Sequence, residues 1–312
     1  MRDVDGRRPA AVVGVDVGGT KTHIATIDTR GERSDVIIPS SAWREGDVFA
    51  HPDNLVRLAS AISDGARVVD HTRIVIGLHD CDTAEQGRAA RAALADELHA
   101  RNVIVANDGE LLGWAENHPT SVQLIVGTGS VVLGRTAAGV PVRALGNGWL
   151  FDDAGSAPAL LREAVASIAS THDDPDISRD PLAQFLFSDY AVSDVPSLAS
   201  AVARDAGPAE WGTRAPLVFE AMRLGSPIAR RVVQRAADSI ASAIASVRAR
   251  GAVADSIVAA GGVIVNQEPL RAAIQNSLAA LSVDLPLHVI AHAPVEGAVR
   301  WAQSLTPPRN TP

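Results

Sequence analysis

The sequence contains very little cysteine and few aromatic residues. Cys81 is the only cysteine among 312 residues, so the chain can form neither an internal disulfide nor a metal site built from cysteines alone. Aromatic residues make up 4% of the sequence, whereas hydrophobic residues as a whole make up 46%. The chain can therefore bury sizeable cores, and aliphatic side chains must fill them.

Two further absences concern membranes and nucleic acids. No apolar run approaches the roughly 20 residues that a helix needs to span a bilayer, and the first ten residues are too polar for a secretory signal. The formal net charge of −8 lacks the basic surplus that is typical of nucleic-acid-binding proteins. We therefore expect a cytoplasmic protein that binds neither a membrane nor a nucleic acid.

Short apolar segments alternate with helical periodicity along the whole chain, which at 312 residues suits two domains. The first part predicts strands over 11–17, 23–27, 34–39, 73–78 and 102–106, and helices over 52–66 and 83–100. The second part predicts strands over 123–126, 131–135, 255–260 and 287–291, a mostly helical stretch over 158–250 with an acidic loop at 172–180, and helices over 269–281 and 295–304. A hairpin followed by parallel crossovers indicates a mixed sheet flanked by helices.

Two of the predicted hairpin turns combine glycine with hydroxyl residues. The first contains Gly18, Gly19, Thr20, Lys21 and Thr22, and the second contains Gly127, Thr128, Gly129 and Ser130. Glycine lets a backbone approach phosphate closely, and successive N–H groups form an anion-binding concavity. The pair therefore favours a polyphosphate site, although glycine is also the default residue of ordinary hairpin turns.

Four motifs, in order, resemble those of the actin/hexokinase/Hsp70 superfamily, most closely N-acetylglucosamine kinases and the BadF/BadG/BcrA/BcrD-type ATPases. They are DVGGTKT at 16–22, VGTGS at 126–130, VAAGGV at 258–263 and PVEGAV at 294–299. The resemblance implies an α/β fold of two actin-like (ribonuclease H-like) domains, each a mixed five-stranded sheet flanked by helices, with the active cleft between them. The expected domains are residues 1–116 with 294–312, and residues 117–293.

The resemblance also implies ATP and Mg²⁺ as ligands. ATP phosphates would bind at the two glycine turns, with the adenosine near Gly261, Gly262 and Asn266. Asp16 would hold Mg²⁺ through water, since Mg²⁺ keeps several waters when it binds proteins; alternatively, Asp16 bonds its own turn. Asp108 matches the general base that accepts a proton from the 6-hydroxyl of an amino sugar; alternatively, it caps a helix that begins near Leu111.

Several residues are expected near the sugar, namely Asn107, Asp108, Gly146, Gly148, Asp153, His79 and Asp80. Trp43 and Arg44 lie where related kinases place sugar contacts. Because adjacent residues of an extended segment face opposite sides, we do not expect His79, Asp80 and Cys81 to share one metal ion. The favoured interpretation is that these three residues are polar groups that line the cleft or cap the next helix.

The segment 144–156 departs from the kinase pattern. Gly146, Gly148, Asp153, Gly155 and Ser156 match it, but Ala154 replaces a carboxylate. An ATP-dependent amino-sugar kinase is the favoured function, and a nucleotide- or sugar-binding sensor without turnover remains the alternative. The single cysteine argues against the branch of the superfamily that shares an iron–sulfur cluster between subunits. The resemblance leaves open whether the chain forms a homodimer.

Overall fold

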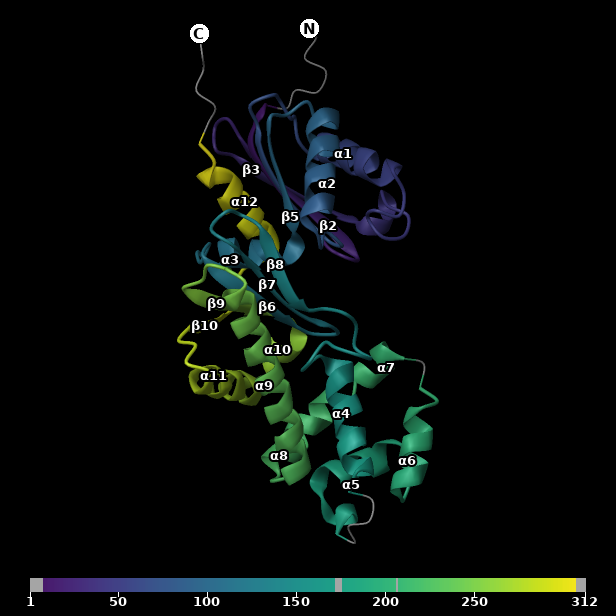
Figure 1. Cartoon of the computed structure of the whole chain (residues 1–312). Helices are drawn as coiled ribbons and strands as arrows, with labels where there is room; N and C mark the ends of the chain where they lie inside the picture. Colours follow the sequence, from purple (N-terminus) through teal and green to yellow (C-terminus); the bar gives the residue numbers. More distant parts are fainter. Residues whose placement is uncertain (1–7, 172–175, 206, 307–312) are drawn as a thin grey trace. The chain divides into compact units, whose positions relative to one another are not determined.

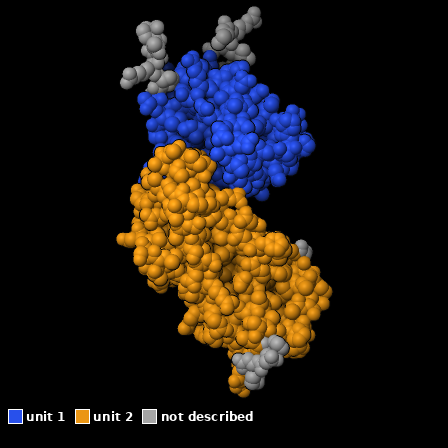
Figure 2. Space-filling model, viewed as in Figure 1, with its two compact units in different colours: residues 1–119, 290–312 blue, residues 120–289 orange. Residues whose placement is uncertain are grey.

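The computed structural model describes residues 8–171, 176–205 and 207–306. The chain divides into two compact units, residues 1–119 with 290–312 and residues 120–289 (Figure 2). We call them the first and second unit. Part of the predicted acidic loop at 172–180, and the ends of the predicted first domain at 1–7 and 307–312, lie outside the described residues.

The first unit contains a mixed five-stranded sheet with the strand order β3-β2-β1-β4-β5 (Figure 1). Its strands are β1 (Ala10–Val17), β2 (Lys21–Asp28), β3 (Arg33–Pro39), β4 (Arg73–Leu78) and β5 (Asn102–Asn107). β1 pairs antiparallel with β2 and parallel with β4, which in turn pairs parallel with β5. The register aligns Val17 with Leu78, and Leu78 with Asn107. The three parallel strands therefore end side by side.

Helices cover both faces of this sheet. They are η1 (Ser40–Ala42), α1 (Asp53–Gly65), α2 (Ala84–Glu97), η2 (Asp108–Glu110), α3 (Leu111–Ala115) and α12 (Pro294–Ser304). Alternate side chains of β1 supply two separate cores, as a strand buried on both faces requires. Val13 and Val15 pack with α1 and α2, whereas Val12 packs with α3 and α12.

Two glycines allow α12 to lie directly on its neighbours. A Cβ atom on Gly14 would come within 2.7 Å of the Val299 nitrogen, and one on Gly297 would come within 1.9 Å of the Leu111 oxygen. Real Cβ contacts are never that short, so both positions require glycine. This close packing explains why the PVEGAV motif contains a glycine.

The second unit contains another mixed five-stranded sheet, with the order β10-β9-β6-β7-β8. Its strands are β6 (Ser121–Val126), β7 (Ser130–Arg135), β8 (Pro141–Leu145), β9 (Ser256–Ala260) and β10 (Leu287–Val289). Its helices are α4 (Ala157–Ala169), η3 (Ile177–Arg179), α5 (Pro181–Asp189), α6 (Val195–Val202), α7 (Pro208–Gly212), α8 (Ala215–Arg223), α9 (Pro227–Ala249), α10 (Gly262–Asn266) and α11 (Glu268–Ala280). The predicted fold class, two mixed five-stranded sheets flanked by helices, is confirmed.

The prediction missed β8 and α10. β8 begins at a proline, and all five of its residues are only half-buried, so its sequence lacks the alternation of a typical strand. α10 has five residues and starts directly after two glycines, which is too short for helical periodicity. Within residues 8–171, 176–205 and 207–306, no helix has the length and hydropathy to cross a membrane.

Candidate active site

The first glycine turn joins β1 to β2 as predicted. The N–H of Gly18 donates to the carbonyl of Lys21 at 3.0 Å and closes the turn. The carbonyl groups of the turn are bound by the segment that follows β3: Ser40 Oγ donates to Gly18 O at 2.8 Å, Ser40 N to Thr20 O at 2.9 Å, and Arg44 Nη2 to Gly19 O at 2.7 Å.

The N–H groups of the same turn are available to a ligand. Gly19 and Thr20 are exposed, and among the described residues neither N–H donates a hydrogen bond within the protein. Lys21 is exposed beside them. Donors that point away from fixed carbonyls, next to an ammonium group, form an anion-binding surface.

Thr22 does not contribute its hydroxyl to that surface, contrary to the prediction. Its side chain is fully buried, its Oγ1 accepts a hydrogen bond from Trp43 Nε1 at 2.9 Å, and Ser40 Oγ lies 3.1 Å away. Trp43 and Arg44, which were predicted near the sugar, contact the glycine turn and the start of β2. Ser40, Trp43 and Arg44 therefore hold the glycine turn and Thr22 in place through hydrogen bonds.

Asp108 directly follows β5. The expected alternative, that Asp108 caps the helix beginning at Leu111, is wrong because no side chain caps α3. Asn107 caps η2: its Oδ1 accepts from Gly109 N at 2.9 Å, a donor that it shares with Asp108 Oδ1, and Glu110 reaches back to Asn107 N at 3.1 Å. Asn107 Nδ2 also lies 3.3 Å from Cys81 O, so the Asn107 side chain is engaged within the protein rather than free for a sugar. The Asp108 side chain remains 27% exposed.

A glycine in β4 sets the position of Asp108. A Cβ atom on Gly77 would lie 2.4 Å from Leu111 Cδ1 and 3.1 Å from the Cα atom of Asp108. Glycine at this position therefore lets η2 and α3 rest directly on the strand. The result is a carboxylate at the same sheet edge as the glycine turn.

His79 and Asp80 form a turn after β4, and the expectation of an extended segment is wrong. Asp80 has a φ angle of 64°, so its side chain faces His79 instead of the opposite side. His79 Nδ1 lies 3.3 Å from Asp108 Oδ2, and His79 Nε2 lies 3.4 Å from Asp80 Oδ1. The hydrogen bond to Asp108 raises the pKa of His79 above its ordinary value, and the charges of Asp108 and Asp80 act in the same direction.

Asp16 lies at the end of β1, near the charges of Asp108, His23 and Lys21. Burial, together with the charge of Asp108, raises the pKa of Asp16 to about 6. In the described part of the chain, no hydrogen-bond donor reaches its carboxylate, and no group of three or more His, Cys, Asp and Glu residues could hold a metal ion. Mg²⁺ fits here, because it takes one or two carboxylates and completes its shell with water and substrate phosphates.

The second glycine turn joins β6 to β7, again as predicted. Gly127 N donates to Gly129 O at 2.8 Å, and Thr128 is exposed. Ser130 is buried, however, and its Oγ donates to Ala154 O at 2.9 Å. The Ser130 hydroxyl, predicted to bind phosphate, therefore fixes the loop after β8 against this turn.

Asp153, predicted to lie near the sugar, is buried within that loop. The residue is 6% exposed, and its Oδ1 accepts from Gly148 N at 3.3 Å. Burial raises the pKa of Asp153, and hydrogen bonds from the backbone of Gly148, Ser130 and Gly146 partly oppose that shift. Gly146 and Gly148 have φ angles of 83° and 97°, which shape the loop around the carboxylate.

The Gly261-Gly262 pair lies against the second glycine turn. Gly261 has a φ angle of 104°, and a Cβ atom there would lie 2.4 Å from the Val126 oxygen. A Cβ atom on Gly127 would lie 3.5 Å from the Gly262 nitrogen. Asn266 Nδ2 donates to Gly262 O at 2.7 Å, so this side chain stabilises the start of α10. The second unit thus brings two of the predicted nucleotide-binding motifs together.

Comparison with known proteins agrees with these motifs. The model of the BadF/BadG/BcrA/BcrD ATPase family matches residues 13–302. The chain belongs to this family. Membership in an ATPase family implies that ATP is its nucleotide. No curated protein sequence matches the chain significantly.

Solved structures with the same fold include sugar kinases. A protein assigned as an N-acetylglucosamine kinase from Chromobacterium violaceum has a TM-score of 0.57 and 22% identity, over 95% of this chain and 99% of that one. A protein with the same assignment from Porphyromonas gingivalis has a TM-score of 0.58 and 17% identity, over 94% and 99%. The ROK hexokinase of Thermus thermophilus has a TM-score of 0.55 and 20% identity, over 94% and 97%. This chain therefore has a fold like that of sugar kinases.

The support from Ser40, Trp43 and Arg44 was missed by sequence reasoning, although a signal for it exists. Pro39 pairs with Lys21 in the β2–β3 ladder, so the chain that leaves β3 must pass beside the glycine turn. The carbonyl groups of the turn need hydrogen-bond donors, and the segment after β3 passes close enough to supply them.

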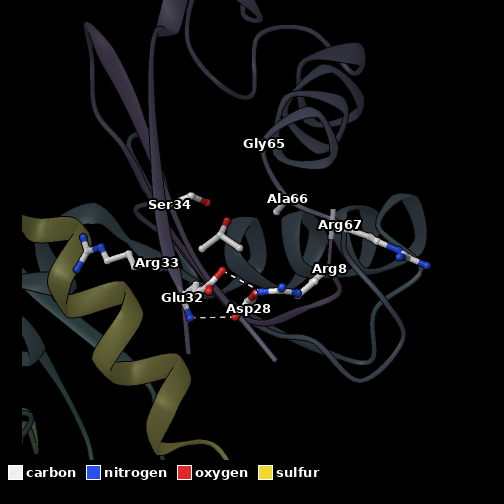
Figure 3. Close-up of a pocket in the computed structure, with 9 residues that line it drawn as sticks. Arg8, Asp28, Glu32, Arg33, Ser34, Gly65, Ala66 and Arg67 are labelled. Carbon is white, nitrogen blue, oxygen red and sulfur yellow. Dashed lines mark hydrogen bonds and ion pairs between the residues drawn. The ribbon is translucent and has the colours of Figure 1, made fainter. Parts of the chain in front are cut away.

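A charged cavity of about 350 Å³ in the first unit lies away from these residues (Figure 3). It is lined by the far end of β2, the start of β3 and the end of α1. Arg8 pairs there with Glu32 at 2.9 Å and with Asp28 at 3.4 Å, and Arg33 turns towards α12, where it pairs with Glu296. None of the predicted site residues lines it.

Proposed function

We propose that the protein is an ATP-dependent sugar kinase that transfers the γ-phosphate of ATP to the 6-hydroxyl of an amino sugar, N-acetylglucosamine or a relative. The strongest support is one edge of the first sheet. There, the anion-binding turn after β1 and the partly exposed Asp108 carboxylate after β5 follow residues that are aligned in register. Phosphoryl transfer needs these two elements together.

Each group of this edge has a chemical task. The N–H groups of Gly19 and Thr20 and the ammonium group of Lys21 bind phosphate oxygens. Asp16 holds Mg²⁺, which neutralises phosphate charge when it is bound. Asp108 accepts the proton of the sugar hydroxyl as that oxygen attacks phosphorus, and it must be ionised to do so. In the second unit, the exposed Thr128 and the backbone of Gly261 and Gly262 contact the nucleotide.

The proposal is tested by measuring ADP release and sugar phosphate with N-acetylglucosamine, N-acetylmannosamine, glucosamine, N-acetylmuramic acid and glucose. Replacing the base, Asp108→Asn, should lower kcat by about 10²–10⁴-fold and leave ATP binding intact. Asp96→Asn is a matched control, because Asp96 is an exposed carboxylate of α2 in the same unit. Equal activity of Asp108→Asn and wild type would refute the mechanism.

A sensor that binds nucleotide or sugar without turnover is the second candidate. The loop after β8 favours it, because Ala154 replaces a carboxylate of the kinase pattern and Asp153 is buried by its own loop. If every sugar fails while ATP still binds, as measured by calorimetry, the sensor replaces the kinase.

A further inference from the structure

His79 lies between the phosphate turn and the carboxylate of Asp108. Its Nδ1 is 3.3 Å from Asp108 Oδ2, and its Nε2 would be 3.8 Å from a Cβ atom on Gly19. The other oxygen of Asp108, Oδ1, accepts from Gly109 N at 2.9 Å. Each carboxylate oxygen therefore has one donor and keeps a lone pair for a substrate hydroxyl.

His79 is itself held in place by a chain of charged groups. Asp80 Oδ1 lies 3.4 Å from His79 Nε2, and Asp80 Oδ2 accepts from Val48 N at 3.3 Å. Arg44 Nη1 lies 3.8 Å from the same Asp80 oxygen, and Arg44 Nη2 donates to Gly19 O. A continuous path thus connects the phosphate turn with Asp108 inside one unit.

The left-handed backbone of Asp80 is required for this path. Non-glycine residues rarely adopt a positive φ angle, and Asp is among those that tolerate it. At 64° the carboxylate of Asp80 faces back towards His79, which an extended residue would not allow. Strained residues of this kind cluster at functional sites.

We propose that His79 is a positioning residue for phosphoryl transfer, whose Nδ1–H holds Oδ2 of Asp108 so that the carboxylate faces the incoming hydroxyl. This inference rests on the proposed kinase function. Without the contact, among the described residues only the N–H of Gly109 restrains the Asp108 carboxylate, whose last bond has a broad torsional preference. Asp80 is an acceptor on the other side, so it fixes the orientation of the imidazole ring.

Two amide variants distinguish the contribution of His79 Nδ1 from that of His79 Nε2. In His79→Asn, the amide nitrogen takes the place of Nδ1 and keeps the donor to Asp108; in His79→Gln, it reaches the place of Nε2 and keeps only the contact with Asp80. We expect His79→Asn to retain kcat within about threefold, and His79→Gln and His79→Ala to lose about 10²-fold in kcat at unchanged KM for ATP. Equal losses in the Asn and Gln variants, with thermal unfolding like wild type, would overturn the proposal.

A double variant tests whether His79 acts through Asp108. In the Asp108→Asn background, His79→Ala should cause no further loss of kcat, because the group that it positions is already gone. If the same loss appears in both backgrounds, or if His79→Ala raises the KM for ATP instead, His79 acts on the nucleotide and the proposal fails.

The contact can also be measured without turnover, which separates this inference from the kinase function. The nitrogen-15 resonance of His79 Nδ1 should shift on Asp108→Asn substitution, and it should not shift on Asp96→Asn substitution. An unchanged resonance would end the proposal. If wild type phosphorylates no sugar while this resonance does shift, the kinase function fails and the contact stands.

Discussion

The two glycine turns arise from the same sequence pattern but differ in what surrounds them. The first turn has its carbonyls bound by Ser40 and Arg44, while its N–H edge and Lys21 are exposed. The second turn has the buried carboxylate of Asp153 against it, and only Thr128 presents an exposed side chain. Phosphate binding should therefore depend more on the first turn. Substitutions at the second turn should instead have the larger effect on the stability of the fold.

The largest expected effect is on the stability of the second unit. Gly261→Ala places a methyl group 2.4 Å from the Val126 oxygen, at a φ angle of 104° that side chains rarely adopt. We expect a loss of about 3 kcal/mol in the free energy of unfolding, measured in urea. Gly262→Ala is the matched control, because nothing lies within 4 Å of its Cβ position. Similar losses in both variants would contradict this account.

Hydrogen exchange can assign that loss to one unit. Amides of β6 and β9 should exchange faster in Gly261→Ala, whereas amides of β1 and β4 should be unchanged, since opening is local to a cooperative unit. Faster exchange throughout both sheets would instead indicate that the two units unfold together.

The next prediction compares Asp153 and Asp16, two carboxylates whose pKa is raised by burial, and the expected effects on stability have opposite signs. Asp153→Ala leaves the N–H groups that it accepts without a partner and should cost about 1–3 kcal/mol. Asp16→Ala removes a carboxylate that accepts no hydrogen bond from the described residues and is repelled by the charge of Asp108. It should raise the stability of the metal-free protein at pH 8 by about 2–3 kcal/mol, since each of the two units by which the pKa is raised corresponds to about 1.4 kcal/mol.

The effect at Asp16 should depend on pH in a defined direction. Its pKa is about 6 in the folded protein and about 4 when the chain is unfolded, so the folded state binds the proton more tightly. The stability of the metal-free wild type should therefore fall as pH rises from about 4 to about 6. In Asp16→Ala that fall should be smaller, and at pH 4 the gain should vanish. Chemical unfolding in EDTA at several pH values measures both, and a gain at pH 4 as large as at pH 8 would refute the assignment.

The hairpin strands, several helix starts and the position of Asp108 could be predicted from the sequence, because short local segments determine them. The strands of both hairpins follow from apolar runs that end in glycine, and four helices of the second unit begin at an Asp or Ser cap closely followed by proline, at Ser156, Asp180, Asp194 and Ser226. Asp108 was predictable at a strand end, because its strand is strongly apolar.

The roles of short polar side chains could not be predicted in this way. Thr22, Ser130 and Asp153 stand next to glycine turns and have the chemistry of ligand contacts, yet each is buried and bonded within the protein. Burial of such a side chain depends on which distant segment packs over it. The same holds for His79, whose partner Asp108 lies 29 residues further along the chain.

The smallest expected effect concerns the exposed side chains of the two turns. Lys21 is the only lysine of the chain and lies on the first turn, whereas Thr128 is its exposed counterpart on the second. Lys21→Gln should weaken ATP binding by about fivefold at low salt, because a solvated charge contributes little and is screened. Thr128→Ala should weaken it less, and the Lys21 effect should shrink at high salt, as measured by calorimetry. Since no other side-chain amine is present, acylation of Lys21 can be mapped on a single peptide, and ATP should protect it. Unprotected Lys21 with bound ATP would show that the nucleotide does not use the first turn, and the contrast between the two turns would then have no functional meaning.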